Sequence, residues 1–289
     1  MVSVILIVKD EARQIARCLE SVTWAEEIIV LDSGSRDQTV EICRRYTPHV
    51  YCTDWPGFGP QKQRALEYAT QEWVLSLDAD EYLSPALCQE IHQAICSPHY
   101  VGYQIPRLST YCGREMRHGG WWPDPVLRLF RRDCARFSSD LVHERVVVTG
   151  AVARLHAPLQ HEAFVDLEEV LAKVNHYSTL AAVSAYQRGV RSSLPKAVAK
   201  GWWSFVRTYL LRRGFLDGRE GLMLALSNAE GSYYKYLKIA QLEGQSPGSA
   251  HSVQQTDSKD LFPSGVTAKK HHDLSGSVGD KGCDDRKTL

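Results

Sequence analysis

The chain of 289 residues is long enough for one large domain, or for one domain with an appendage. Hydrophobic residues make up 44% and charged residues 24%, the proportions of an ordinary soluble globular protein. Lysine plus arginine and aspartate plus glutamate both number 34, so the overall charge does not favour a nucleic-acid partner.

The first residues, MVSVILIVKDE, resemble a signal peptide only briefly. They lack a basic start, the apolar core is short, and charged residues follow at once. We therefore interpret residues 3–8 as a first buried strand. No run in the chain approaches the roughly 18–20 apolar residues that span a bilayer. The protein is expected to stay in the cytoplasm.

Two patterns alternate over the first hundred residues. Continuous apolar runs indicate strands, and apolar residues at helical spacing indicate helices. The predicted strands are residues 3–8, 27–31, 50–53 and 73–77. The predicted helices are residues 11–21, 36–46 and 60–70. Buried strands that alternate with amphipathic helices predict an α/β fold, with a mostly parallel, Rossmann-like sheet flanked by helices.

The pattern changes after Gly102. Shorter strands with turns, mixed or antiparallel, are predicted up to about residue 155. Residues 166–242 are predicted to be helical, with breaks near 191–195 and 213–218. Residues 244–289 are rich in Ser, Gly, Asp and Lys and nearly free of apolar residues, so we predict a disordered tail.

Acidic residues follow the fourth predicted strand, and ligands of parallel sheets bind at the carboxyl ends of strands. Asp78 and Asp80 lie two residues apart there, so a strand period of two would project both side chains to one side. Two hard oxygen ligands with open positions suit Mg²⁺ or Mn²⁺ shared with substrate phosphates. The alternative is an acidic loop that caps the next helix, with Ser84 before Pro85 as its cap.

Three further clusters are expected near the same edge of the sheet. Asp32 ends the second strand and could bind a ribose or a base edge, unless this is a plain loop with capping residues. Glu11 follows the first strand within an acidic cluster. Gly57, Gly59 and Lys62 precede or begin a predicted helix, where they would favour a diphosphate. Lys62 is alternatively a solvated helix charge.

The segments VILIVKDEA, IIVLDSGSRDQT, GPQKQRAL and WVLSLDADEYLS, in this order and spacing, resemble family 2 glycosyltransferases of the GT-A fold. WWPDPVLRLFRR, LVHERV and KVNHYSTLAAVSAYQRG resemble, more narrowly, the bacterial branch that includes lipopolysaccharide-core β-1,4-glucosyltransferases. The resemblance covers about residues 2–240. It implies a GT-A catalytic domain over 1–165, with a nucleotide-sugar half at about 1–100 and an acceptor half at about 101–165. A C-terminal helical extension at 166–243 and the tail would follow.

The resemblance also implies roles for single residues. The nucleotide-sugar pocket would include Glu11, Asp32 and Lys62, with Asp78 near the ribose and the metal. Asp80 would hold the Mg²⁺ or Mn²⁺ ion that bridges the diphosphate. His161 could complete that metal site, as histidines do in some enzymes of this fold, or it could be structural.

A base is needed as well, because an acceptor hydroxyl is a poor nucleophile until its proton is removed. In many family members an acidic element follows a strand like VLRLFRR, and the nearest match here is Val142-His143-Glu144, so this resemblance makes Glu144 the first candidate and Asp124 the second. Glu144 is alternatively a surface carboxylate paired with an arginine. Attack from the far face of the sugar predicts inversion at the anomeric carbon.

The sequence thus predicts a metal-dependent, inverting hexosyltransferase with a UDP-sugar donor, the sugar being glucose by the branch resemblance. The expected acceptor is a saccharide, lipid-linked, in cell-envelope glycan or lipopolysaccharide-core synthesis, and no nucleic-acid partner is expected. The alternatives within the fold are transfer to a polyprenyl phosphate or to a peptide side chain. A nucleotidyltransferase would open with a glycine-rich basic loop, whereas this loop is acidic. A non-catalytic sugar-nucleotide-binding protein would not need the intact Asp-X-Asp motif.

Residues 196–215 combine apolar and aromatic side chains with lysines and arginines. A basic amphipathic helix of this kind can lie on an anionic membrane surface. The resemblance to enzymes with lipid-linked acceptors makes peripheral contact with the inner face of the plasma membrane an attractive hypothesis. The alternative is a helix packed on the catalytic domain or in a dimer.

Overall fold

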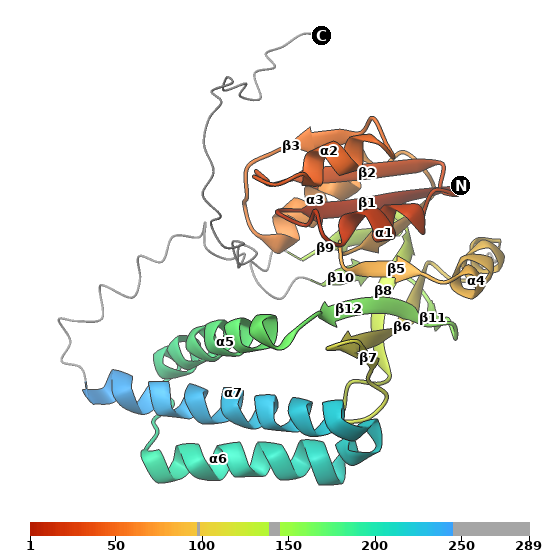
Figure 1. Cartoon of the computed structure of the whole chain (residues 1–289). Helices are drawn as coiled ribbons and strands as arrows, with labels where there is room; N and C mark the ends of the chain where they lie inside the picture. Colours follow the sequence, from red (N-terminus) through yellow and green to blue (C-terminus); the bar gives the residue numbers. More distant parts are fainter. Residues whose placement is uncertain (97–98, 139–144, 245–289) are drawn as a thin grey trace, which may run out of the picture.

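The computed structural model describes residues 1–96, 99–138 and 145–244 of the chain (Figure 1). The elements up to residue 77 are β1 (Val2–Val8), α1 (Ile15–Glu20), β2 (Glu27–Asp32), α2 (Thr39–Arg44), β3 (Val50–Cys52), α3 (Phe58–Tyr68) and β4 (Trp73–Leu77). The elements from residue 81 to residue 164 are β5 (Glu81–Leu83), α4 (Pro85–Ile95), β6 (Gly102–Tyr111), β7 (Arg114–Glu115), β8 (Asp124–Arg131), the 3-10 helix η1 (Arg132–Cys134), β9 (Ala135–Phe137), β10 (Val146–Val148), β11 (Val152–Arg154) and β12 (Leu159–Phe164). Beyond residue 244, the predicted tail lies outside the described residues.

One large sheet organises the molecule, with strand order β3-β2-β1-β4-β8-β6-β12-β5. β1 pairs in parallel with β2 and β4, and β2 pairs in parallel with β3. β8 is antiparallel to both β4 and β6, whereas β12 is again parallel to β6. The predicted mostly parallel sheet is therefore confirmed in its first half, and the predicted mixed strands follow in the second.

The strands are apolar because helices cover both faces of the sheet. In β1, Val4 and Leu6 pack into a core cluster with residues of α1 and α4, whereas Ile5 packs with residues of α3 on the other face. This alternation follows from the two-residue period of a strand. Each fully buried aliphatic side chain contributes roughly 1.5–3 kcal/mol, so the double burial of β1 and β4 is a large part of the stability.

β5 is a strand that the sequence patterns did not predict. It is three residues long and pairs antiparallel with β12, so that His161 lies opposite Glu81. α4 then begins at Pro85, and the Ser84 hydroxyl accepts a hydrogen bond from the Leu87 N–H group at 3.2 Å. The predicted capping role of Ser84 is confirmed. The β5–β12 pairing brings a histidine from late in the chain to the acidic turn after β4.

The remaining helices form a layer beside the sheet (Figure 1). They are α5 (Leu167–Gln187), α6 (Leu194–Val206), the π-helical η2 (Arg207–Leu211), the 3-10 helix η3 (Gly214–Asp217) and α7 (Gly218–Gly244). The chain leaves α-helical geometry near both predicted breaks. Tyr111, Met116, Val170 and Leu224 form a buried cluster that joins this layer to the sheet, and Trp121 packs against it. Within the described ranges, the model contains no helix with the length and apolar character needed to cross a bilayer.

Candidate active site

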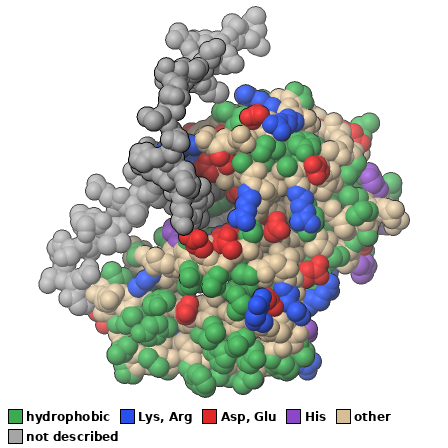
Figure 2. Space-filling view, viewed as in Figure 1, with side chains coloured by type: hydrophobic (Ala, Val, Ile, Leu, Met, Phe, Trp, Pro, Cys, Tyr) green, Lys and Arg blue, Asp and Glu red, His purple; other side chains and the backbone are tan. Residues whose placement is uncertain are grey.

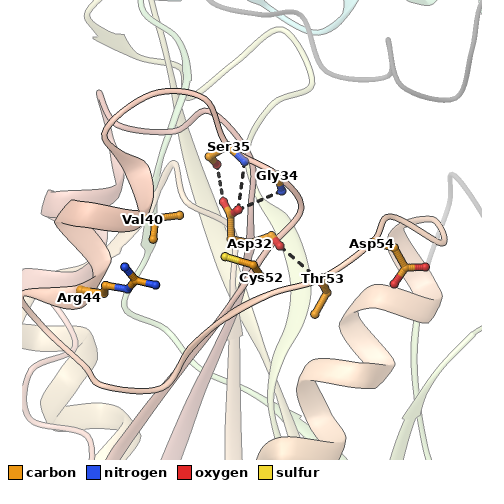
Figure 3. A pocket seen from close by; sticks show the side chains of 8 residues that line it. All are labelled: Asp32, Gly34, Ser35, Val40, Arg44, Cys52, Thr53 and Asp54. Carbon is orange, nitrogen blue, oxygen red and sulfur yellow. Dashed lines mark hydrogen bonds between the residues drawn. The ribbon is translucent and has the colours of Figure 1, made fainter. Parts of the chain in front are cut away.

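The carboxyl ends of β2 and β3 open into a cavity of about 470 Å³. It is lined by Asp32, Gly34, Ser35, Val40, Arg44, Cys52, Thr53 and Asp54 (Figure 3). The Asp32 carboxylate accepts the N–H groups of Gly34 and Ser35 at 2.9 and 3.0 Å, and it also bonds to the Ser35 hydroxyl. Asp32 thereby holds the loop that forms one wall of the cavity. Contact of Asp32 with a ribose or a base stays a prediction.

Lys62 and Asp78 lie at the centre of an ion network in which Lys62 is buried and Asp78 is partly exposed. The Lys62 Nζ atom donates to Asp78 Oδ1 at 2.9 Å, and the Arg128 guanidinium donates to Asp78 Oδ2. Burial alone would raise the pKa of Asp78, but the charges of Arg128 and Lys62 bring it well below its usual range. Asp78 is thus held as a carboxylate by two cations of the protein itself, and Lys62 is a buried partner instead of a solvated helix charge.

Glu81, the third carboxylate of the motif, completes this network. Its side chain is fully buried, and it accepts the Asp78 N–H group at 3.0 Å. Its other oxygen accepts from Arg128 at 2.6 Å and from Arg107 at 3.4 Å. Asp78 and Glu81 can lie close together because Lys62 and the two arginines balance their negative charges. The two arginines were not predicted as site residues.

Asp80 has different partners from Asp78. Its Oδ2 atom lies 3.3 Å from His161 Nε2, and the other ring nitrogen of His161 bonds to the Ser109 hydroxyl at 2.8 Å. β4 ends at Leu77, and the Glu81 N–H group donates back to the Asp78 carbonyl at 3.0 Å. The two aspartates therefore lie in a turn, where the strand period assumed from the sequence does not apply.

The residues around Asp80 fit a divalent cation. Asp80 Oδ1 is buried and has no hydrogen-bond partner among the described residues. A buried unpaired oxygen costs about 1–3 kcal/mol, more when it is charged, and a cation would remove that cost. Carboxylate and imidazole are both metal ligands, and Ser109 would fix the ring orientation of His161. The described part of the chain holds no cluster of three or more His, Cys, Asp or Glu side chains placed to bind a metal, so water or substrate oxygens would supply the other ligands.

Glu11 lies near Asp80 at the end of β1. Its N–H group donates to Thr39 Oγ1 at 2.7 Å, which ties this loop to the start of α2. Burial, and then the charge of Asp80, raise the pKa of the Glu11 carboxyl to about 8. Glu11 is therefore protonated at neutral pH when no cation is present.

A Glu11→Gln variant tests this protonation. Because the folded-state pKa of Glu11 is raised, the native protein binds more protons than the unfolded chain between the unfolded pKa of about 4.3 and pH 8. The stability of the native protein should therefore fall as the pH rises across this range, and a glutamine at position 11 should remove that loss. We expect the free energy of unfolding of Glu11→Gln, relative to that of the wild type, to increase from pH 5 to pH 8. Urea unfolding in EDTA measures it, and a constant difference would contradict the raised pKa.

The structure describes only one of the two candidate bases. Glu144, with His143, lies outside the described residues. Asp124 begins β8, and its Oδ2 atom accepts from Arg107 Nε at 3.0 Å and from Arg107 Nη2 at 2.7 Å. Since Arg107 also contacts Glu81, Asp124 is connected to the ion network of Asp78. Its Oδ2 atom is thus already engaged by the guanidinium of Arg107.

The sheet order, the helices on both faces and the acidic residues at the strand ends define an α/β protein of the GT-A type. The model of the family described as "Glycosyl transferase family 2" matches residues 3–147, half of the chain. The chain belongs to this family.

Relatives agree with this assignment. The chain is 30% identical over 253 residues to the lipopolysaccharide core biosynthesis glycosyltransferase LpsC of Rhizobium meliloti (strain 1021), covering 83% of this chain and 91% of LpsC. It is 29% identical over 254 residues to an uncharacterised glycosyltransferase of Rickettsia prowazekii (strain Madrid E), covering 83% of this chain and 86% of the relative. Among solved structures, S. aureus TarS 1-349 in complex with UDP has a TM-score of 0.44 and 16% identity, over 84% of this chain and 92% of that one.

Proposed function

We propose that the protein is a metal-dependent, inverting hexosyltransferase that transfers a hexose, glucose as the first candidate, from a UDP-sugar to a lipid-linked saccharide. The reaction would belong to cell-envelope glycan or lipopolysaccharide-core synthesis, at the cytoplasmic face of the plasma membrane. The observation that carries the proposal is the Asp80–His161 pair, with its buried unpartnered oxygen, at the same strand edge as the Asp32 cavity.

The donor would occupy the strand edge between these two places. The cavity beside Asp32 would receive the nucleoside, and its polar loop atoms suit a ribose or a base edge. Lys62 would contribute positive charge near the diphosphate, although its Nζ atom is held by Asp78. The Asp78 network would keep the turn rigid, so that Asp80 faces the diphosphate in one orientation.

Asp80 and His161 would hold the Mg²⁺ or Mn²⁺ ion. When bound, a divalent cation would supply positive charge near the diphosphate, where negative charge grows as its bond to the sugar breaks and the nucleoside diphosphate leaves. Asp80 contributes a hard oxygen ligand, and Ser109 holds the His161 ring in place through Nδ1. The chain's own residues thereby orient the leaving group.

The proposed acceptor is supported by one relative of the chain. LpsC bears the name of a lipopolysaccharide core biosynthesis glycosyltransferase, and the chain matches most of its length. A carboxylate would take the acceptor's proton during attack, and Glu144 is preferred as that base because Arg107 holds Asp124. Attack opposite to the leaving diphosphate would give a β-linked product from an α-linked donor.

The test of the proposed function is a turnover assay over a panel of sugar nucleotides. The protein is incubated with each donor and a detergent-dispersed core glycolipid, with Mn²⁺, Mg²⁺ or EDTA, and released nucleoside diphosphate is measured. Metal-dependent release of UDP and a β-linked product by NMR are expected. Release of pyrophosphate would instead identify a nucleotidyltransferase, and binding without turnover would identify a non-catalytic module.

The choice of base is tested by two conservative substitutions. We expect Glu144→Gln to lower kcat by about 10²–10⁴-fold and leave the affinity for the donor unchanged, because only the proton transfer is lost. Asp124→Asn should have the smaller effect on kcat. Donor affinity is measured by titration calorimetry and kcat by UDP release. The opposite order of the two effects would transfer the role of base to Asp124.

A further inference from the structure

α6 and the turns after it present an exposed apolar side. This side points away from the sheet. Figure 2 shows hydrophobic side chains gathered on the part of the molecule where Figure 1 draws α5, α6 and α7. On α6 and the following turn, the exposed members are Leu194, Val198, Trp202, Trp203, Leu210 and Leu211, which we call the α6 face. Trp202 is 68% exposed and Leu211 is 63% exposed. Exposed apolar patches of this kind mark interaction sites.

The packing of α6 explains why these large side chains point outward. Ala197, Gly201, Ser204 and Thr208 are buried and recur at helical spacing along one side. This side lies against α7, where a Cβ atom on Gly201 would come within 3.1 Å of the Tyr233 side chain. Small residues allow the two helices to approach closely, so the bulky residues occupy the opposite side. The exposure is therefore a consequence of the fold.

A second observation gives the α6 face its charge. Lys196, Lys200 and Arg207 are exposed and share one side of the helix at positions i, i+4 and i+11, with Trp203 between them. Arg212 and Arg213 follow directly, both exposed. From Val170 to Leu216 the chain carries eight Lys or Arg residues and no Asp or Glu, although the protein as a whole has a formal net charge of +0.

We propose that the α6 face binds an anionic lipid bilayer, with α6 lying in the plane of the membrane interface. Apolar residues would enter the boundary of the acyl chains, and the long Lys and Arg side chains would reach the headgroups. Trp202 and Trp203 suit this position, because tryptophan is favoured at membrane interfaces.

Charge complementarity favours lipid over a second copy of this chain. A symmetric dimer through this face would bring the same positively charged surface against itself, whereas anionic headgroups neutralise it. Binding of lipid extends the proposed function but does not rest on it, since it needs neither donor nor acceptor.

The experiment uses the full chain and two kinds of vesicle, phosphatidylcholine alone and phosphatidylcholine mixed with phosphatidylglycerol. We expect the protein to float with the mixed vesicles and to bind them far more strongly than the neutral ones. Lys200→Gln with Arg207→Gln should weaken binding roughly fivefold for each charge removed. The matched control is Arg45→Gln with Arg136→Gln, which removes the same charge from exposed positions just after α2 and on β9, and it should bind like the wild type.

Tryptophan fluorescence gives an independent measurement. Brominated phosphatidylglycerol should quench the fluorescence of the wild type, and Trp202→Phe with Trp203→Phe should remove that quenching while the far-UV circular dichroism spectrum is retained. Absence of binding by the folded wild type would overturn the proposal. A dimer in solution that is broken by Trp202→Ser with Trp203→Ser would also overturn it, and would assign this face to a second copy. UDP release is also assayed with each variant in detergent, where no bilayer is needed. A variant that loses vesicle binding but keeps UDP release has lost lipid binding alone, whereas absence of UDP release from the wild type contradicts the proposed transfer and leaves the lipid proposal to the vesicle experiment.

Discussion

Asp80→Asn is expected to lower metal-dependent turnover about a thousandfold, the largest effect on activity among the substitutions considered. The change preserves the size of the side chain and removes the negative charge beside His161. Stabilisation of charge by a bound metal ion contributes several kcal/mol to such reactions, and each 1.36 kcal/mol is a factor of ten in rate. The measurement is UDP release at saturating donor in Mn²⁺, with Mn²⁺ affinity followed by electron paramagnetic resonance.

Asp133→Asn is the matched control for this variant. Asp133 lies in η1, its side chain is 84% exposed, and its partner is the neighbouring Arg132. Its replacement should change neither turnover nor Mn²⁺ affinity. If Asp80→Asn retains turnover, or if EDTA leaves the wild-type rate unchanged, Asp80 is not the ligand of a catalytic cation.

Arg128→Met is expected to lower the free energy of unfolding by about 3–5 kcal/mol, the largest expected effect on stability. Removal of one partner from a buried ion network leaves the remaining charges without compensation. Here Asp78 and Glu81 would keep Lys62 and Arg107 but lose the cation that bonds to both carboxylates. Urea unfolding at pH 7 measures the loss. Arg128→Lys keeps the charge without the planar guanidinium, so it should fall between the wild type and Arg128→Met and give a folded protein if Arg128→Met does not.

An exposed ion pair provides the control for the network. Glu41 on α2 and Arg45, the residue after its end, form an (i, i+4) pair at 2.6 Å, with both side chains about two-thirds exposed. Arg45→Met should lower the free energy of unfolding by only about 0.3–0.5 kcal/mol.

The pH dependence of stability gives a second test of the Asp78 network. The folded-state pKa of Asp78 is lowered, so its stabilising contribution is present above the unfolded pKa of about 4 and is lost as the pH falls. The difference between wild type and Arg128→Met should therefore narrow in acid. Equal stability at pH 7 would mean that the network contributes nothing.

Much of the sheet was predictable because burial on both faces leaves a local signal. β1, β2 and β4 are continuous apolar runs, and acidic residues follow each of them. β5 gave no such signal, since it has three residues and its partner β12 is far away in the sequence. The strand was therefore missed, although the resemblance to the family gave His161 as a candidate metal ligand.

The site was predictable to the extent that it lies at strand ends. Asp32, Asp78 and Asp80 come directly after apolar runs, where chain position alone indicates a shared edge. Arg107 and Arg128 lie within strands, and an arginine inside a strand is ordinarily a solvent-facing residue. Their burial depends on the antiparallel register of β8 with β4 and β6, which no local pattern encodes. An arginine in an otherwise apolar strand, in a chain with an unbalanced acidic motif, is the signal that could have found Arg128.

The pairing of β5 with β12 has a consequence for the order in which the protein acquires its parts. During synthesis, the residues from β1 to β4, with the Asp32 loop and the Asp78–Asp80 turn, leave the ribosome before His161 has been made. Contacts between segments far apart in the chain form late, because loop closure precedes them. The segment from β1 to β4 can thus form its strand ends first, and the Asp80–His161 pair, the proposed cation site, would form only when β12 docks onto β6 and β5. A half-made chain would therefore have the loop of Asp32 but lack His161, the partner of Asp80 in the proposed cation site.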